Sequence, residues 1–319
     1  MKNNPGNTSP TIIGLDLPET DASSPSLAVE KEPHSVPNNY LKCLFFNARS
    51  MRGETFSELK CLTAQENFDI ITIAETFLDT VNIDLVCEYQ LQGYKLFNRD
   101  RINRRGGGVA IYVKNCLNPT LITHHNNNSE IISVTILTLL RPLNITVVYR
   151  RPGQTIDEDC EMYNTLTDTL QNNDSVIVGD FNLPNINWQN HTGVESESHR
   201  LLTFIDDNFL HQHVRHPTRD NNILDLVISS QEHLITSTHV GEQLSKCDHN
   251  LVRFIINLPT TENKNNNVRI PNYRLANYES LNRSLTDLRL NENDSAEKMW
   301  NSFKQQFLEK QSRHTPTKN

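Results

Sequence analysis

Hydrophobic residues gather in short runs along the middle of the chain, and turn residues separate these runs. Runs rich in Val, Ile, Leu and aromatic side chains predict β-strands. The predicted strands cover 41–46, 70–74, 109–113, 131–140, 144–149, 175–178, 224–229 and 252–258. Apolar residues recur at helical spacing in 156–170 and 201–209. Many strands with few helices favour two sheets packed face to face, with the helices outside.

The chain on either side of this region has a different pattern. Residues 1–39 contain six prolines among Ser, Thr and Asn, without an apolar period, which predicts a disordered leader. An Asn-rich stretch follows the last predicted strand, and two amphipathic helices are predicted around 275–288 and 300–307. We therefore expect a leader at 1–39, a folded domain at 40–259 and a helical linker at 260–319.

Composition narrows the classes of function. The chain has 30 basic and 38 acidic residues, a net charge of −8, which at face value argues against a nucleic-acid binder. The six cysteines show no CxxC spacing, so a zinc site built on paired cysteines is not expected. Because neither a membrane-spanning run nor a secretory signal is visible, we expect an intracellular protein with no membrane partner.

Several apolar runs are followed by polar residues that suit metal binding or proton transfer. A single carboxylate after a strand is usually a turn residue, but a series of such residues is typical of an active site at strand ends. Asp180 and Asn182 are the most informative pair, because Gly179 allows the backbone to turn and the two side chains then emerge on one face. The series comprises Asn47, Glu75, Tyr149, Asp180 and Asn182, followed by Asp248 and His249 just before the last strand.

In chain order, the segments around these residues resemble the motif series of the endonuclease/exonuclease/phosphatase superfamily. The matching segments are Phe-Asn-Ala-Arg at Asn47, Ala-Glu-Thr at Glu75, Val-Val-Tyr-Arg at Tyr149, Gly-Asp-Phe-Asn ending at Asn182, Leu-Asp-Leu-Val at Asp225, and Cys-Asp-His ending at His249. Within the superfamily, residues 104–113 resemble the endonuclease of jockey-like non-LTR retrotransposons. Residues 273–307 resemble the segment that joins such an endonuclease to a reverse transcriptase.

This resemblance implies a fold, an activity and a metal. The fold would be a four-layered α/β sandwich of the DNase I kind. The activity would be nicking of DNA by a phosphodiesterase that depends on Mg²⁺, with Mn²⁺ as an alternative, and oxygen-rich ligands without clustered thiols agree with those ions. Glu75 would hold the metal with Asn47 beside it, and Asp248 would assist near the metal. The partners would be DNA and a reverse transcriptase domain, which would place the protein in the nucleus.

The resemblance also implies roles in proton transfer and phosphate binding. Asp180 would orient or deprotonate the attacking water, and Asn182 and Tyr149 would bind the phosphate. His249, oriented by Asp225, would contact the scissile phosphate or act as a general base.

Arginines supply local positive charge despite the acidic balance of the chain. Basic side chains on a loop that contains glycine suit contact with phosphates or a groove. We expect DNA contacts from Arg104, Arg105, Arg150 and Arg151, with the three glycines at 106–108 bringing the backbone close to DNA.

Two other functions remain open at this point. The superfamily includes phosphatases that act on inositol phosphates or sphingolipids, and the motifs alone do not select the substrate. A catalytically weak, domesticated remnant is the third possibility. Cys247 stands where the family usually has Ser, and because a thiol is a weaker hydrogen-bond donor than a hydroxyl, we expect reduced but not abolished activity.

Overall fold

The computed structural model describes residues 39–78, 88–101, 106–124, 129–170, 173–244, 246–258, 270–271, 276–290 and 295–318. The chain divides into two compact units, Met1–Thr260 and Thr261–Asn319. The predicted disordered leader at 1–39 lies outside the described residues, except for its last residue.

The first unit contains two six-stranded sheets. One sheet has the order β13 (Ile235–Gln243), β14 (Asn250–Asn257), β1 (Tyr40–Asn47), β2 (Ile70–Ala74), β4 (Val109–Lys114), β3 (Tyr94–Arg99). The other has the order β11 (His211–Gln212), β12 (Asp225–Ser229), β8 (Asp174–Asp180), β7 (Leu143–Tyr149), β6 (Glu130–Ile136), β5 (Thr120–Ile122). Each sheet contains one parallel pair, β1 with β2 and β7 with β8, and its other pairs are antiparallel.

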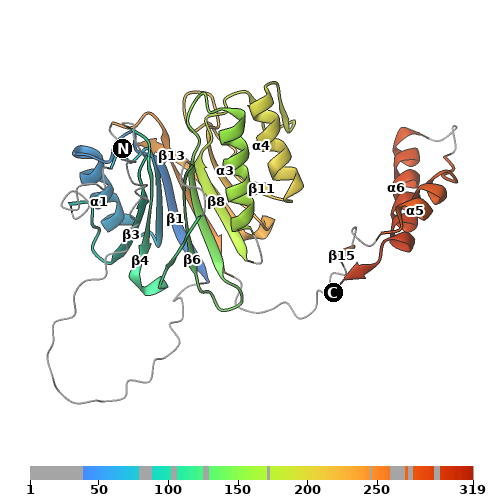
Figure 1. Ribbon diagram of the computed structural model, residues 1–319, viewed down its shortest axis with the longest axis horizontal. Coiled ribbons are helices and arrows are strands. Elements are labelled where there is room, and N and C mark those ends of the chain that lie inside the picture. The colour runs from blue at the N-terminus through green and yellow to red at the C-terminus, as the bar shows by residue number, and fades with distance from the viewer. Residues whose placement is uncertain are drawn as a thin grey trace, which may run out of the picture. The chain divides into compact units, whose positions relative to one another are not determined.

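The sheets pack face to face, and helices cover their outer faces (Figure 1). Helix α1 (Glu54–Glu66) covers the first sheet, and helices α3 (Ile156–Thr169) and α4 (Ser196–Asp207) cover the second. Two short 3-10 helices, η1 (Asn115–Leu117) and η2 (Glu232–Leu234), and a small hairpin of β9 (Ile186–Asn187) and β10 (Thr192–Gly193) complete this unit. These four layers confirm the predicted α/β sandwich.

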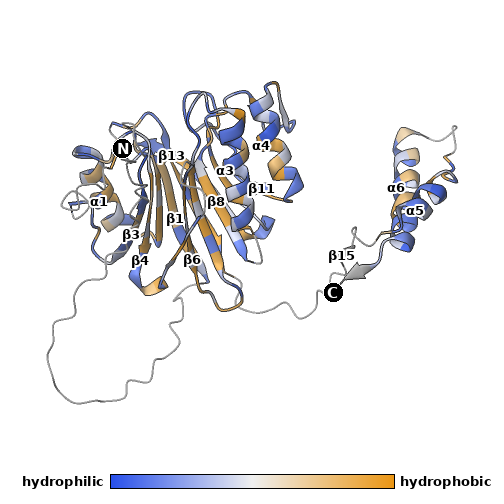
Figure 2. Ribbon diagram, in the orientation of Figure 1, coloured by the Kyte–Doolittle hydropathy of each residue, from blue (hydrophilic) through white to orange (hydrophobic). Residues whose placement is uncertain are grey.

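Both faces of each sheet are buried, and successive side chains of one strand pack into the cores on opposite faces. In β7, Ile145 and Val147 join the core between the sheets, whereas Val148 joins the core beneath α3 and α4. In β2, Ile70 faces the other sheet, and Ile71 packs in the cluster beneath α1. Successive strand side chains point to opposite faces, so strands that are apolar throughout belong to covered sheets. Figure 2 accordingly shows largely hydrophobic strands and helices that are mixed in hydropathy.

The predicted strands are close to those observed, with one boundary correction. The strand predicted at 131–140 ends at Ile136, because residues 137–142 form the connection to β7. In this connection Leu137 and Leu139 are exposed, and the hydroxyl of Thr138 donates to the carbonyl of Arg141. Helix α1 and strands β3 and β13 were not predicted, since their apolar patterns are weaker.

The second unit consists of β15 (Ile270–Pro271), α5 (Tyr278–Leu285), α6 (Ala296–His314) and β16 (Thr317–Lys318). The helices lie where the sequence predicts amphipathic segments. In α6, the rings of Trp300, Phe303 and Phe307 stack in succession. No helix in the described part of the chain is both long enough and apolar enough to cross a membrane.

Candidate active site

The strand pairing brings the polar residues at the strand ends together. Asn47 is paired with Ala74, the residue before Glu75, because β1 and β2 are parallel and end together. In the other sheet, Asp180 is paired with Tyr149 on one side and with Asp225 on the other. The carboxyl ends of the two parallel pairs therefore supply most of the predicted site, and the sheets fix their positions.

Asn47 joins a carboxylate of each sheet. Its side-chain amide donates to Oε1 of Glu75 and to Oδ2 of Asp180, both at 2.9 Å. Its Oδ1 accepts from the backbone N–H of Arg49 at 3.0 Å, which fixes the orientation of the amide. Asn47 is buried, and Glu75 adopts a positive φ of 52°, a conformation that side chains seldom adopt without tertiary support. Asn47 thus holds two acidic side chains close together.

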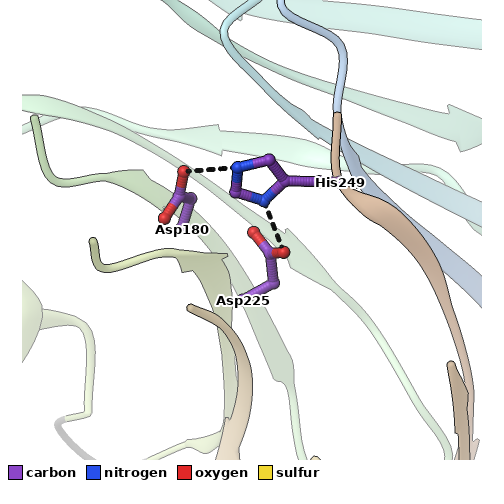
Figure 3. A group of neighbouring side chains, drawn as sticks. All are labelled: Asp180, Asp225 and His249. Atoms are coloured by element: carbon purple, nitrogen blue, oxygen red, sulfur yellow. Dashed lines mark hydrogen bonds and ion pairs between the residues drawn. The ribbon is translucent and has the colours of Figure 1, made fainter. Parts of the chain in front are cut away.

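His249 lies between two buried carboxylates (Figure 3). Its Nδ1 is 2.7 Å from Oδ2 of Asp225, and its Nε2 is 3.9 Å from Oδ2 of Asp180. Burial lowers the pKa of His249, but the hydrogen bond and negative charge of Asp225 outweigh burial and raise it to about 9. Burial and the neighbouring Asp225 raise the pKa of Asp180. An oxygen atom between Nε2 and Asp180 would lie within hydrogen-bond reach of both groups.

Tyr149 and Asn182 complete the same end of the second sheet. Burial, followed by the negative charge of Glu75, raises the pKa of the Tyr149 phenol well above its usual range. The backbone N–H of Asn182 donates to Oδ1 of Asp180 at 2.9 Å, and its side-chain amide donates to the carbonyl of Arg150 at 2.8 Å. Asn182 also has a positive φ of 49°, so the turn after β8 is held in an uncommon conformation.

Asp248 and Cys247 lie at the edge of this cluster. Oδ2 of Asp248 is 2.8 Å from Nη2 of Arg219, so the carboxylate is engaged with a cation. Cys247 is buried, and its thiol donates to the carbonyl of Ala48 at 3.5 Å. Cys247 therefore contacts the backbone next to Asn47.

The structure corrects the predicted set of DNA-contacting arginines. Arg150 is buried, and its guanidinium makes two hydrogen bonds to Asp159, at 2.7 and 3.0 Å. The prediction that it contacts DNA is therefore wrong, because its charge is neutralised inside the protein. Arg151 is paired with Glu158 and remains partly exposed. Arg104 and Arg105 lie outside the described residues.

The glycines at 106–108 have a structural role that the sequence did not indicate. The carbonyl of Gly108 accepts from the N–H of Thr76, and that of Gly107 accepts from the N–H of Phe77. Gly107 has a φ of 70°, a backbone conformation that favours glycine, and a Cβ there would overlap the side-chain ends of Glu130 and Arg101. The loop thus holds the segment that follows Glu75.

Sequence patterns also missed two residues in the turn before β12. Thr218 is buried and bonds to the backbone of Asp225, and Arg219 lies 3.5 Å from Nε2 of His249. The sequence held one usable signal, a short Pro-Thr-Arg-Asp turn a few residues before Asp225. That signal has meaning only once β12 is known to lie beside β8.

The described residues also form an open groove of about 780 Å³. Its walls come from the segment that follows Asn182 and the segment that leads to Asp225. Amides, Trp188 and Arg215 line much of it, and none of the lining residues is acidic: Pro184, Asn185, Ile186, Asn187, Trp188, Gln189, Arg215, Pro217, Asn221, Asn222 and Ile223. A groove with an arginine and without acidic lining residues suits a polyanion.

The donor set fits a hard divalent cation. Glu75 and Asp180 are held on one amide nitrogen, and Asp180, Asp225 and His249 each offer a ligand atom within 4.8 Å of the others. Oδ1 of Asp225 is buried without a hydrogen-bond partner among the described residues. Oxygen donors of this kind are the ligands that Mg²⁺ and Mn²⁺ prefer.

Comparisons with known proteins agree with this fold. Residues 143–253 match the model of a family described as endonuclease-reverse transcriptase. The endonuclease domain of TRAS1, a telomere-specific non-LTR retrotransposon, superposes with a TM-score of 0.54 at 18% identity, covering 69% of this chain and 99% of that domain. The AP endonuclease LMAP from Leishmania major gives a TM-score of 0.58 at 13% identity, with 69% and 88% covered. An AP endonuclease from Archaeoglobus fulgidus gives 0.53 at 15%, with 68% and 99% covered. No curated protein sequence matches the chain.

Proposed function

We propose that this chain carries an endonuclease domain of the endonuclease/exonuclease/phosphatase superfamily and that it nicks DNA in a Mg²⁺-dependent reaction, as the endonuclease of a non-LTR retrotransposon. The observation that carries the proposal is the convergence of Asn47, Glu75, Asp180 and the Asp225–His249 pair at one end of the sandwich. Hydrolysis of a phosphodiester needs these elements: a site for a cation, an oriented water and a proton donor or acceptor.

Each side chain has a defined part in this mechanism. Glu75 would hold the cation, and Asn47 keeps Glu75 and Asp180 in place. A bound Mg²⁺ would neutralise charge on the phosphate and stabilise the leaving oxygen. Asp180 orients the attacking water, because both of its oxygens are fixed by hydrogen bonds, to Asn47 and to the backbone of Asn182. Asp248 assists from the edge of the site.

His249 faces the same space as Asp180. Asp225 accepts from Nδ1 of His249, which directs Nε2 toward the phosphate, where His249 donates a proton or accepts one from water. Tyr149 presents its hydroxyl beside Glu75, where it binds a phosphate oxygen, and Asn182 shapes the turn next to it.

DNA is favoured as the substrate by a groove that has no acidic lining residue and by the retrotransposon endonuclease among the similar structures. On this proposal, the nick primes reverse transcription in the nucleus, by a reverse transcriptase that follows the helical segment at 260–319. Arg151, Arg104 and Arg105 are the proposed DNA-contacting arginines.

The proposal is tested by incubating the full chain with supercoiled plasmid in Mg²⁺ or in EDTA. The Glu75→Gln variant should lose at least about 100-fold in nicking rate, since it removes the charge that holds the cation. The Glu279→Gln variant is the matched control, because Glu279 lies in an exposed ion pair with Arg283 in α5, and it should nick like the wild type.

Other results would identify the alternative functions. Release of phosphate from an inositol phosphate without nicking would contradict the proposal in favour of a phosphatase. Absence of turnover on both substrates would indicate a catalytically weak remnant.

A further inference from the structure

Arg219 lies in a tight turn immediately before β12. Its backbone N–H donates to the carbonyl of Asn222 at 3.2 Å, and the N–H of Asn222 donates to the carbonyl of Arg219 at 2.8 Å. Asp220, inside the turn, has a positive φ of 50°. These two reciprocal bonds fix the point from which the arginine side chain starts.

The preceding residue, Thr218, fixes this turn to the catalytic cluster. Its buried hydroxyl accepts from the backbone N–H groups of Leu224 and Asp225, both at 3.1 Å. Its carbonyl accepts from the N–H of Asn250, the residue after His249, at 2.7 Å. Thr218 therefore bonds to both segments that carry the Asp225–His249 pair, and Arg219 has a fixed position relative to the imidazole.

Asp225 bonds Nδ1 of His249, and the guanidinium of Arg219 lies near the other ring nitrogen, Nε2. Its Nη1 is 3.5 Å from Nε2 of His249, and its Nη2 is 2.8 Å from Oδ2 of Asp248. The arginine side chain is 40% exposed, whereas that of His249 is 1% exposed. The guanidinium thus stands at the border between the buried imidazole and solvent, where a phosphate of an approaching strand would arrive.

Nε2 of His249 has different neighbours on its two sides. The Asp180 carboxylate lies 3.9 Å away, and the Arg219 guanidinium lies 3.5 Å away. The carboxylate suits a water molecule, whereas the guanidinium suits an anion. An oxygen of a phosphate placed between Nη1 and Nε2 would receive two converging N–H groups, an arrangement that arginine forms readily with phosphates.

We propose that Arg219 is a further catalytic residue, which binds a non-bridging oxygen of the scissile phosphate together with His249. Asp248 holds the guanidinium in place before the substrate binds. The inference rests on the proposed nuclease function. It adds that the guanidinium of Arg219 binds the phosphate on the side of His249 opposite the water held by Asp180.

The inference is tested by single-turnover nicking of supercoiled plasmid with the full chain at saturating DNA and Mg²⁺. The Arg219→Ala variant should be about 100-fold slower or worse, the loss typical of one donor to the reacting group. Arg219→Lys should retain more activity, because it keeps the charge but loses the planar fork. Arg253→Lys is the matched control, since Arg253 of β14 forms a similar ion pair with Glu66 of α1, and this change should alter the rate less than about twofold.

Chemical rescue separates substrate contact from a structural role. Added guanidinium ion at millimolar concentration should restore part of the lost rate to Arg219→Ala, and should not accelerate the wild type or His249→Ala. Equal thermal unfolding midpoints for Arg219→Lys and the wild type would show that the turn remains folded.

The outcomes distinguish this inference from the proposed function. A wild-type chain that does not nick overturns both. A wild-type chain that nicks, with Arg219→Ala within about threefold of its rate, overturns only the role of Arg219. A slow Arg219→Ala variant that guanidinium does not rescue also overturns it, because the arginine would then act through the fold alone.

Discussion

The thiol of Cys247 lies against the backbone that carries Asn47. Its donor contact to the carbonyl of Ala48 is 3.5 Å long, and burial raises the pKa of the thiol to about 12. Cys247 therefore stays protonated at neutral pH, and a thiol is a weak donor. The two segments that it joins, which carry Asn47 and His249, are both parts of the candidate site.

Replacing Cys247 by Ser should increase the nicking rate a few-fold, because a hydroxyl donates a stronger hydrogen bond to Ala48 and holds these segments more firmly. Plasmid nicking rates at saturating Mg²⁺ measure the effect. Cys43→Ser is the control, since Cys43 is fully buried in the core between the sheets and its replacement should lower stability without raising the rate. A Cys247→Ser rate at or below that of the wild type would count against the interpretation.

His213 is a histidine whose sequence context does not reveal its environment. It belongs to a group with His211 and His216 that could suggest a metal site. In the structure its Nε2 is 2.7 Å from the hydroxyl of Ser229, and burial, followed by the neighbouring His211 and Arg215, lowers its pKa to about 4. His213 therefore stays neutral in the folded protein at mildly acid pH.

This lowered pKa predicts a loss of stability in acid. Below about pH 6.5 the unfolded chain takes up a proton at His213 that the folded chain refuses until about pH 4, so the free energy of unfolding falls as the pH decreases through this window. At pH 5 the contribution should be about 1 to 2 kcal/mol. Urea unfolding at pH 7.5 and pH 5 measures it.

The His213→Gln variant keeps a polar group near Ser229 without titrating, so it should lose less stability between these two pH values than the wild type. The other histidines are present in both proteins, and their effects cancel in the comparison. Equal pH dependence in both proteins would show that His213 does not contribute.

At the scale of elements, strand β8 depends on a glycine next to its last residue, Asp180. Gly179 is paired with Val148 of β7, and a Cβ on Gly179 would overlap the carbonyl oxygen of Val148. Close approach of β7 and β8 sets the register that places Tyr149 beside Asp180. The need for glycine thus comes from strand packing as well as from the turn that follows.

Gly179→Ala should destabilise the domain by about 3 kcal/mol or more and reduce nicking with it, because the backbone of two central strands must separate. The control is Gly153→Ala. Gly153 has a φ of 67°, but no atom lies within 4 Å of the position that a Cβ would take, so this change should cost only about 1 to 2 kcal/mol of backbone strain. Thermal unfolding with a nicking assay on both variants provides the comparison, and equal losses would contradict the packing argument.

At the scale of the whole molecule, an acidic chain is proposed to act on a polyanion. Four of its carboxylates, Glu75, Asp180, Asp225 and Asp248, lie in or beside the candidate site, where a divalent cation would offset part of their charge. Residues 260–319 carry ten basic and seven acidic side chains. The net charge of −8 therefore excludes strong, sequence-independent electrostatic binding and leaves metal-assisted contact possible.

DNA binding should accordingly be weak, should decrease with salt and should decrease when EDTA removes the cation. Fluorescence anisotropy with a labelled duplex, measured over a salt series with Ca²⁺ or EDTA, tests this expectation. In Glu75→Gln the difference between Ca²⁺ and EDTA should shrink. If neither salt nor EDTA changes the affinity, the expectation of metal-assisted, salt-sensitive binding is overturned. Such a result would mean that neither phosphate neutralisation nor the cation contributes to binding.

The sequence by itself determined most of the strands and the polar residues that end them. Strands such as β2 and β7 are covered on both faces, so their apolar runs are nearly continuous and easily read. The polar residues that end them stand out for the same reason. Helix α1 has a weak apolar pattern and begins without a side-chain cap, so its local sequence offered little sign of it.

Only the tertiary structure decided what these side chains contact. The parallel pairing of β1 with β2 and of β7 with β8, and the packing of the sheets, brought Asn47 to Asp180 across 133 residues of sequence. The same packing buried Arg150 against Asp159 and placed Arg219 beside His249. A charged residue looks the same in sequence whether it meets solvent, a buried partner or a catalytic group, because that difference depends on long-range contacts between distant segments.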